Sequence, residues 1–125
     1  MLKPLTQFYC DCCGSIIKEP KHGWVEWLMI SGPGKNDYYF EGHRIVHHMA
    51  YSPLKPFGGH CYTYQNNPHR ADAHLTEFLN KQTGIAELLR FLDPGPIHEP
   101  IYEGPRFEHL RPYIEFMRRL TICFR

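Results

Sequence analysis

Three cysteines lie within four positions near the start of the chain, in the stretch Cys10-Asp11-Cys12-Cys13-Gly14. Two thiolates three positions apart, those of Cys10 and Cys13, can bind one tetrahedral metal ion when the chain turns tightly between them. The glycine that follows suits the left-handed backbone of such a turn. Cys12 would then point away from the ion. The segment predicts half of a zinc site.

The other half is expected farther along, where two adjacent histidines precede a loop rich in proline and glycine that ends near Cys61. We predict a Zn²⁺ site with the ligands Cys10, Cys13, His47 and Cys61. His48 is the alternative nitrogen ligand, because successive strand residues face opposite sides and only one can reach the ion. His60 is a third choice. Three sulfurs and one nitrogen would leave no open position, so this zinc is expected to be structural.

Two other uses of the cysteines stay open. Unligated cysteines are common in hydrophobic cores. A Cys-x-x-Cys pair can also be a redox dithiol, which needs a helix N-terminus to lower the pKa of its first thiol. The residues from Gly14 to Pro20 are a short run with no helical pattern. This mismatch makes the redox alternative weaker than the zinc site.

One catalytic pattern survives a search for enzyme motifs. The order His47-His48, Gly58-Gly59, Asn66-Asn67 and His74 loosely resembles the HNH nuclease motif. The resemblance implies that His48 is a general base, that Asn66 braces the loop and that His74 binds a divalent ion. The formal net charge is only +1, from 14 basic and 13 acidic residues, so no general basic field favours nucleic acid as a partner. We therefore prefer a binding role to an enzyme activity.

The elements that must position these residues divide the chain into two halves. Its 125 residues are expected to form one domain, 1–125, with a β and loop half at about 8–65 and a helical half at about 67–121. Trp24–Ile30 and Tyr38–His48 favour strands and flank a turn-rich segment, which predicts a β-hairpin with a bulge at Gly42. The hairpin would return its strand end to the cysteine turn.

Helical periodicity follows Asn67-Pro68, which fits a helix start. The first helix is expected to pack through Ala71, His74, Leu75, Phe78 and Leu79, and the second through Ile85, Leu88, Leu89 and Leu92. The third, near 106–120, is expected to turn Leu110, Ile114, Met117 and Thr121 inward, with Pro112 at a kink or at its start. The sequence thus predicts an α+β fold, in which a zinc-ribbon-like β-hairpin unit packs against two or three C-terminal helices.

Taken together, residues 8–17, 23–28 and 44–61 resemble small bacterial proteins with a Cys-x-x-Cys-Gly knuckle, a Trp-rich strand and an Ile-Val-His-His strand end. The resemblance implies a zinc-ribbon-like fold and brings no assigned activity. Met1–Gln7 has no apolar signal core and no apolar run reaches membrane-spanning length, so we expect a cytoplasmic protein without a membrane partner. The expected function is a small zinc-binding interaction or regulatory module with a protein partner.

Overall fold

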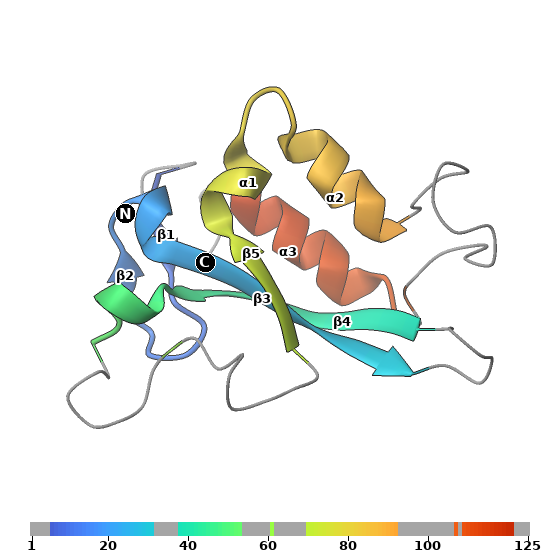
Figure 1. Cartoon of the computed structure of the whole chain (residues 1–125), viewed down its shortest axis with the longest axis horizontal. Coiled ribbons are helices and arrows are strands. Elements are labelled where there is room, and N and C mark those ends of the chain that lie inside the picture. The colour runs from blue at the N-terminus through green and yellow to red at the C-terminus, as the bar shows by residue number, and fades with distance from the viewer. Residues whose placement is uncertain are drawn as a thin grey trace.

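The computed structural model describes residues 6–31, 38–53, 61, 70–92, 107 and 109–121. Within these ranges the chain forms its strands first and its α-helices later, as Figure 1 shows, so the predicted α+β class is confirmed. The elements are β1 (Phe8–Tyr9), β2 (Ile16–Ile17), the 3-10 helix η1 (Pro20–His22), β3 (Gly23–Ser31), β4 (Tyr38–His47), the 3-10 helix η2 (Met49–Tyr51), β5 (Arg70–His74), α1 (Leu75–Leu79), α2 (Gly84–Leu92) and α3 (Arg111–Thr121).

Two antiparallel sheets set the frame. The strands β1 and β2 pair with each other, and the larger sheet has the order β4-β3-β5. The predicted hairpin is present as β3 and β4, in which Gly23 pairs with His47. Figure 1 shows α1, α2 and α3 on one side of the larger sheet and the β1–β2 hairpin at one end of it. His47, the last residue of β4, lies at this end of the larger sheet.

The hairpin carries the predicted irregularity at Gly42. The pairing register between β3 and β4 shifts between Glu26 and Leu28, and Gly42 opposite has a φ of 67°. Only glycine adopts this left-handed conformation without strain. The bulge adds a residue to β4, and the next side chain, His43, lies among the aromatic rings of β3, α2 and α3.

The predicted start of the first helix is wrong. Residues 70–74 form a strand, and the helix does not start before Leu75. Ala71 and Ala73 pair with Trp27 and Val25 of β3, and their small side chains pack against the core. Pairing with a central strand therefore overrides the intrinsic helix preference of alanine. The predicted cap, Asn67-Pro68, lies outside the described residues.

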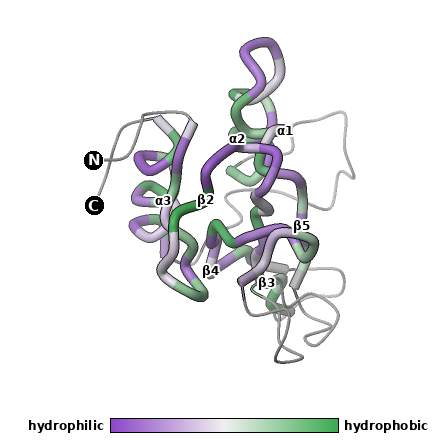
Figure 2. Tube along the Cα trace, turned by 90° about the vertical axis from the view of Figure 1, so that its left-hand side faces the viewer, coloured by the Kyte–Doolittle hydropathy of each residue, from purple (hydrophilic) through white to green (hydrophobic). Residues whose placement is uncertain are grey.

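The inward faces of α2 and α3 also differ from the prediction. In α2, Leu88 and Phe91 are buried while Ile85 is 72% exposed. In α3, the buried residues are Tyr113, Phe116 and Leu120, whereas Leu110 precedes the helix and is exposed. The larger aromatic side chains remove more apolar area from water than the aliphatic ones predicted to lie inside. Figure 2 shows the resulting alternation of hydrophilic and hydrophobic residues along α3.

A single cluster of buried residues joins the two sheets to the helices. It includes Phe8, Cys10 and Ile17 of the N-terminal hairpin, Val25 and Ile45 of the larger sheet, and Leu75, Phe91, Phe116 and Leu120 of the helices. The cysteine turn is thus built onto the core, which restricts how it moves relative to β4.

Candidate metal centre

The turn that carries Cys10 and Cys13 is closed by its own backbone. The Cys10 amide donates to the Ser15 carbonyl at 2.9 Å, and the Gly14 amide donates to the Cys10 carbonyl at 2.9 Å. Gly14 has a φ of 79°, the left-handed conformation predicted from the sequence. The Cys12 amide also lies 3.4 Å from Sγ of Cys10, a contact that stabilises a thiolate. We call residues 8–17 the knuckle hairpin.

The knuckle hairpin is fixed to β4 through Asp11. The Asp11 amide donates to the Ile45 carbonyl at 2.8 Å, and the Ile45 amide donates to Oδ2 of Asp11 at 2.7 Å. These two bonds lie two residues before His47, the last residue of β4. Cys10 and Cys13 are therefore held beside the strand end that carries the histidine.

Cys61 is fully buried and is held by two side chains. Its amide donates to the Ser52 hydroxyl at 3.1 Å, and that hydroxyl donates to Sγ of Cys61 at 3.3 Å. Nη2 of Arg44 donates to the Cys61 carbonyl at 3.3 Å, while the same guanidinium pairs with the buried carboxylate of Glu26. The charge of Glu26 thereby orients the arginine that positions a candidate ligand.

The four predicted ligands lie together. One ligand atom from each of Cys10, Cys13, His47 and Cys61 lies within 4.8 Å of the other three. Nδ1 of His47 is 3.5 Å from Sγ of Cys13 and 3.8 Å from Sγ of Cys61. A nitrogen and a sulfur bound to one zinc ion, at about 2.0–2.1 and 2.3 Å, lie roughly 3.5 Å apart in a tetrahedron. The donor set and its spacing are compatible with a metal site.

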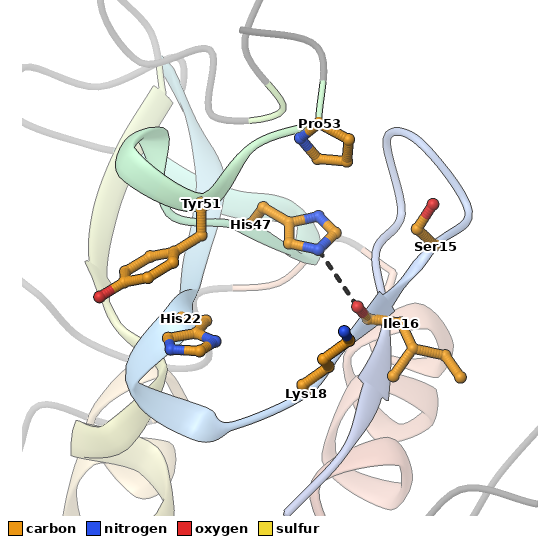
Figure 3. Close-up of a pocket in the computed structure, with 7 residues that line it drawn as sticks. All are labelled: Ser15, Ile16, Lys18, His22, His47, Tyr51 and Pro53. Atoms are coloured by element: carbon orange, nitrogen blue, oxygen red, sulfur yellow. Dashed lines mark hydrogen bonds between the residues drawn. The ribbon is translucent and has the colours of Figure 1, made fainter.

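The other ring nitrogen of His47 faces away from the thiols. Nε2 lies 3.3 Å from the Ile16 carbonyl, the contact drawn as a dashed line in Figure 3. Because a carbonyl only accepts, this nitrogen carries the proton and Nδ1 presents a lone pair to the sulfurs. Metal-binding histidines commonly have such a backbone partner, which fixes their tautomer and orientation.

The thiols of this cluster differ in acidity. Burial raises the pKa of the Cys10 thiol and raises that of Cys61 to about 12. Burial acts in the same direction on Cys13, but hydrogen bonds from Ser15 and from the two neighbouring thiols outweigh it and lower its pKa. Burial lowers the pKa of His47, which favours the neutral, coordinating imidazole. Binding of a cation to all four groups must therefore release protons from the thiols.

The alternative site residues lie elsewhere. His48 is not part of the cluster, because its Nδ1 accepts from the Ala50 amide at 3.1 Å and its ring stacks on Trp24. The ring of His74 also stacks on Trp24, with 4.2 Å between centroids, and 6.2 Å separates the centroids of the two imidazoles. His60 and Asn66 lie outside the described residues. In the described ranges, the two histidines do not join a third potential ligand to form a second metal-binding group.

Several supporting residues were not predicted. Asp11 stands out in the sequence as a charged residue inside the cysteine turn, but residue spacing could not identify its partner on β4. Arg119 donates to both carboxylate oxygens of Asp11 at 2.7 and 2.6 Å and to the Tyr9 carbonyl at 2.9 Å. In the sequence it is one of several arginines along a helix. Ser52 carries no motif.

No protein-family model matches the chain, and neither a curated protein nor a solved structure matches it significantly. Within the described ranges, no helix has both the length and the apolar character needed to cross a membrane.

Proposed function

We propose that the protein is a small zinc-binding module in which Cys10, Cys13, His47 and Cys61 hold a structural Zn²⁺ ion. The observation that carries the proposal is the convergence of these four side chains from three separate segments. Sulfur-rich tetrahedral sets favour zinc over magnesium or calcium, which prefer oxygen ligands. The zinc-ribbon-like character expected from the sequence belongs to the same proposal.

The proposed role of the module is binding, as an interaction or regulatory protein with a protein partner. Four protein ligands leave no coordination position for water or substrate, and closed sites of this kind stabilise a fold instead of catalysing a reaction. When bound, the ion would cross-link the knuckle hairpin to the end of β4 and to Cys61. His47 would bind it through Nδ1 while the Ile16 carbonyl holds Nε2, an arrangement that supports a fixed structural ligand.

The test is the metal content of protein purified without a histidine tag or added metal, measured by elemental mass spectrometry together with a thiol titration. We expect one zinc per chain and two reactive thiols, those of Cys12 and Cys123, among the five cysteines. Cys13→Ser and Cys61→Ser should lose the zinc and unfold at lower temperature, because a structural zinc site contributes folding free energy.

Cys12→Ser is the matched control, because this exposed cysteine lies beside Cys13 but outside the cluster. It should keep the zinc and the melting temperature of the wild type and lose one reactive thiol. The proposal is wrong if the wild type contains no zinc and all five thiols react. It is also wrong if the Cys13 and Cys61 variants bind as much zinc as the wild type.

A further inference from the structure

A cavity of about 390 Å³ lies beside the candidate metal centre, between the knuckle hairpin and the 3-10 helices η1 and η2 (Figure 3). A cavity of about 150 Å³ is enough to hold a benzene molecule. This one therefore has room for a small organic ligand. Residues that line it include Ser15, Ile16, Lys18, His22, His47 and Tyr51.

The polar side chains that line the cavity are chiefly hydrogen-bond donors. Lys18 contributes an ammonium group, Ser15 a hydroxyl that also bonds to the Cys13 thiol, and His22 an imidazole. No carboxylate belongs to the part of the lining that the structure describes. In Figure 3, Lys18 and His22 lie on the same side of the cavity, below His47. Glu19 pairs with Nε2 of His22 at 3.2 Å but does not line the cavity.

The ammonium group of Lys18 makes no ion pair with any residue in the described ranges, so its charge is available to a ligand. Nε2 of His47 already contacts the Ile16 carbonyl and is not available. The lining therefore offers one positive charge, that of Lys18, because the Ser15 hydroxyl is bonded to the Cys13 thiol and His22 is paired with Glu19. An unpaired ammonium group favours an oxyanion as its ligand.

The rest of the lining is apolar. The ring of Tyr51 stacks on His22, with 3.9 Å between centroids, and half of this tyrosine is exposed. Its hydroxyl points away from the other lining residues in Figure 3, so the aromatic ring, not the hydroxyl, faces the cavity. Ile16 and Pro53 complete the apolar surface. A ligand with a compact apolar body beside its charge would bury that body here.

We propose that this cavity binds a small organic oxyanion, a carboxylate or a phosphate monoester on a compact apolar group. Lys18 binds the anion, and Ile16 and Tyr51 pack against the apolar part. The inference deepens the proposed binding role by naming a ligand class. His47 lines the cavity and is also a candidate metal ligand, so the bound anion would lie against the imidazole of the candidate metal centre.

The test is isothermal titration of the zinc-loaded protein with benzoate and with phenyl phosphate. Benzamide is the uncharged control of the same shape. We expect saturable one-to-one binding of at least one anion, and the tighter of the two identifies carboxylate or phosphate as the preferred group. Lys18→Gln should weaken that binding about tenfold, because a hydrogen bond to a charged group is lost. Lys21→Gln removes the same charge from an exposed position outside the lining and should have no effect.

Three results would overturn the inference: no saturable binding of either anion, equal binding of benzamide, or equal weakening by the two lysine variants. Zinc content is measured in the same samples. Absent binding in protein with a full zinc complement removes the ligand site and leaves the proposed zinc module standing. Absent zinc removes the module itself, whatever the anion does.

Discussion

His43 lies outside the candidate metal centre and is packed among aromatic rings. The ring of Trp27 lies nearly parallel to it at 5.6 Å and that of Phe91 perpendicular to it at 4.7 Å. Among the residues that the structure describes, Nε2 of His43 has no hydrogen-bond partner. A perpendicular aromatic face can accept a weak hydrogen bond from an imidazole N–H. Burial lowers the pKa of His43 from 6.5 to about 3, so this imidazole is neutral in the folded protein.

This pKa predicts that His43 makes the fold sensitive to acid. As the pH falls below about 6.5, the unfolded chain binds a proton that the folded protein does not accept until about pH 3, so stability is lost in this window. His43→Phe keeps a ring and removes the titration. From pH 7 to pH 5, the free energy of unfolding of the wild type should fall by about 2 kcal/mol more than that of the variant. Urea unfolding at the two pH values measures both.

His109→Gln is the control for this measurement, because it removes an exposed histidine and keeps His43. Comparing each protein with itself at two pH values removes any packing cost of the larger phenyl ring. Equal losses of stability in the wild type and in His43→Phe would show that His43 is protonated equally in the folded and unfolded states.

At the scale of elements, Arg119 connects α3 to the knuckle hairpin. Arg119 forms two bonds to the carboxylate of Asp11, which itself bonds to Ile45 of β4. Nη1 of Arg119 makes both of these bonds and Nη2 donates to the Tyr9 carbonyl, so two nitrogens of one planar guanidinium fix its orientation. The last turn of α3 is therefore held against the turn that carries Cys10 and Cys13.

Arg119→Ala should therefore destabilise the fold by about 1–2 kcal/mol, since it removes charged hydrogen bonds at a partly buried position. It should also speed the release of zinc to a chelator, because Asp11 loses one of its two anchors. Arg118→Ala is the matched control, as Arg118 pairs only with Glu115 at the surface of the same helix, among the described residues. We expect a change of at most about 0.5 kcal/mol there. Denaturant unfolding measures the loss of stability, and a chelator assay measures the rate of zinc release. Equal values for both variants would show that Arg119 does not anchor the knuckle hairpin.

The elements also show what the sequence alone could predict. The cysteine turn, the left-handed Gly14 and the bulge at Gly42 follow from local spacing and backbone preference, so they were predicted. The strand at residues 70–74 was not, because it depends on pairing with β3 far away in the chain. The contact between Asp11 and Arg119 joins residues 108 positions apart, and no local pattern distinguishes this arginine from Arg118. The inward face predicted for α3 was also wrong. Helical periodicity counts every apolar residue equally, so it did not distinguish Ile114 from the larger Phe116, which is buried.

At the scale of the whole molecule, the knuckle hairpin depends on its neighbours. The strands β1 and β2 pair over only two positions each, which is too little for independent stability. Burial of Phe8 and Ile17 in the common core and the bonds of Asp11 to Ile45 and Arg119 contribute part of what is missing, and the proposed zinc ion would contribute more. The centre of the larger sheet is different, because β3 pairs with a strand on each side and is covered by helices.

Removal of zinc by a chelator should therefore loosen the molecule unevenly. We expect hydrogen exchange at the amides of Cys10, Asp11 and Gly14 to accelerate by at least about a hundredfold, because their backbone bonds open when the turn unfolds. The amide of Val25 lies in the central strand of the larger sheet and should keep most of its protection. Ile45 should show an intermediate loss, since its amide donates to Asp11. Exchange measured by NMR before and after chelation distinguishes this gradient from two alternatives. Uniform loss of protection would mean that zinc holds the entire fold, and unchanged protection would mean that the core alone holds the knuckle hairpin in place.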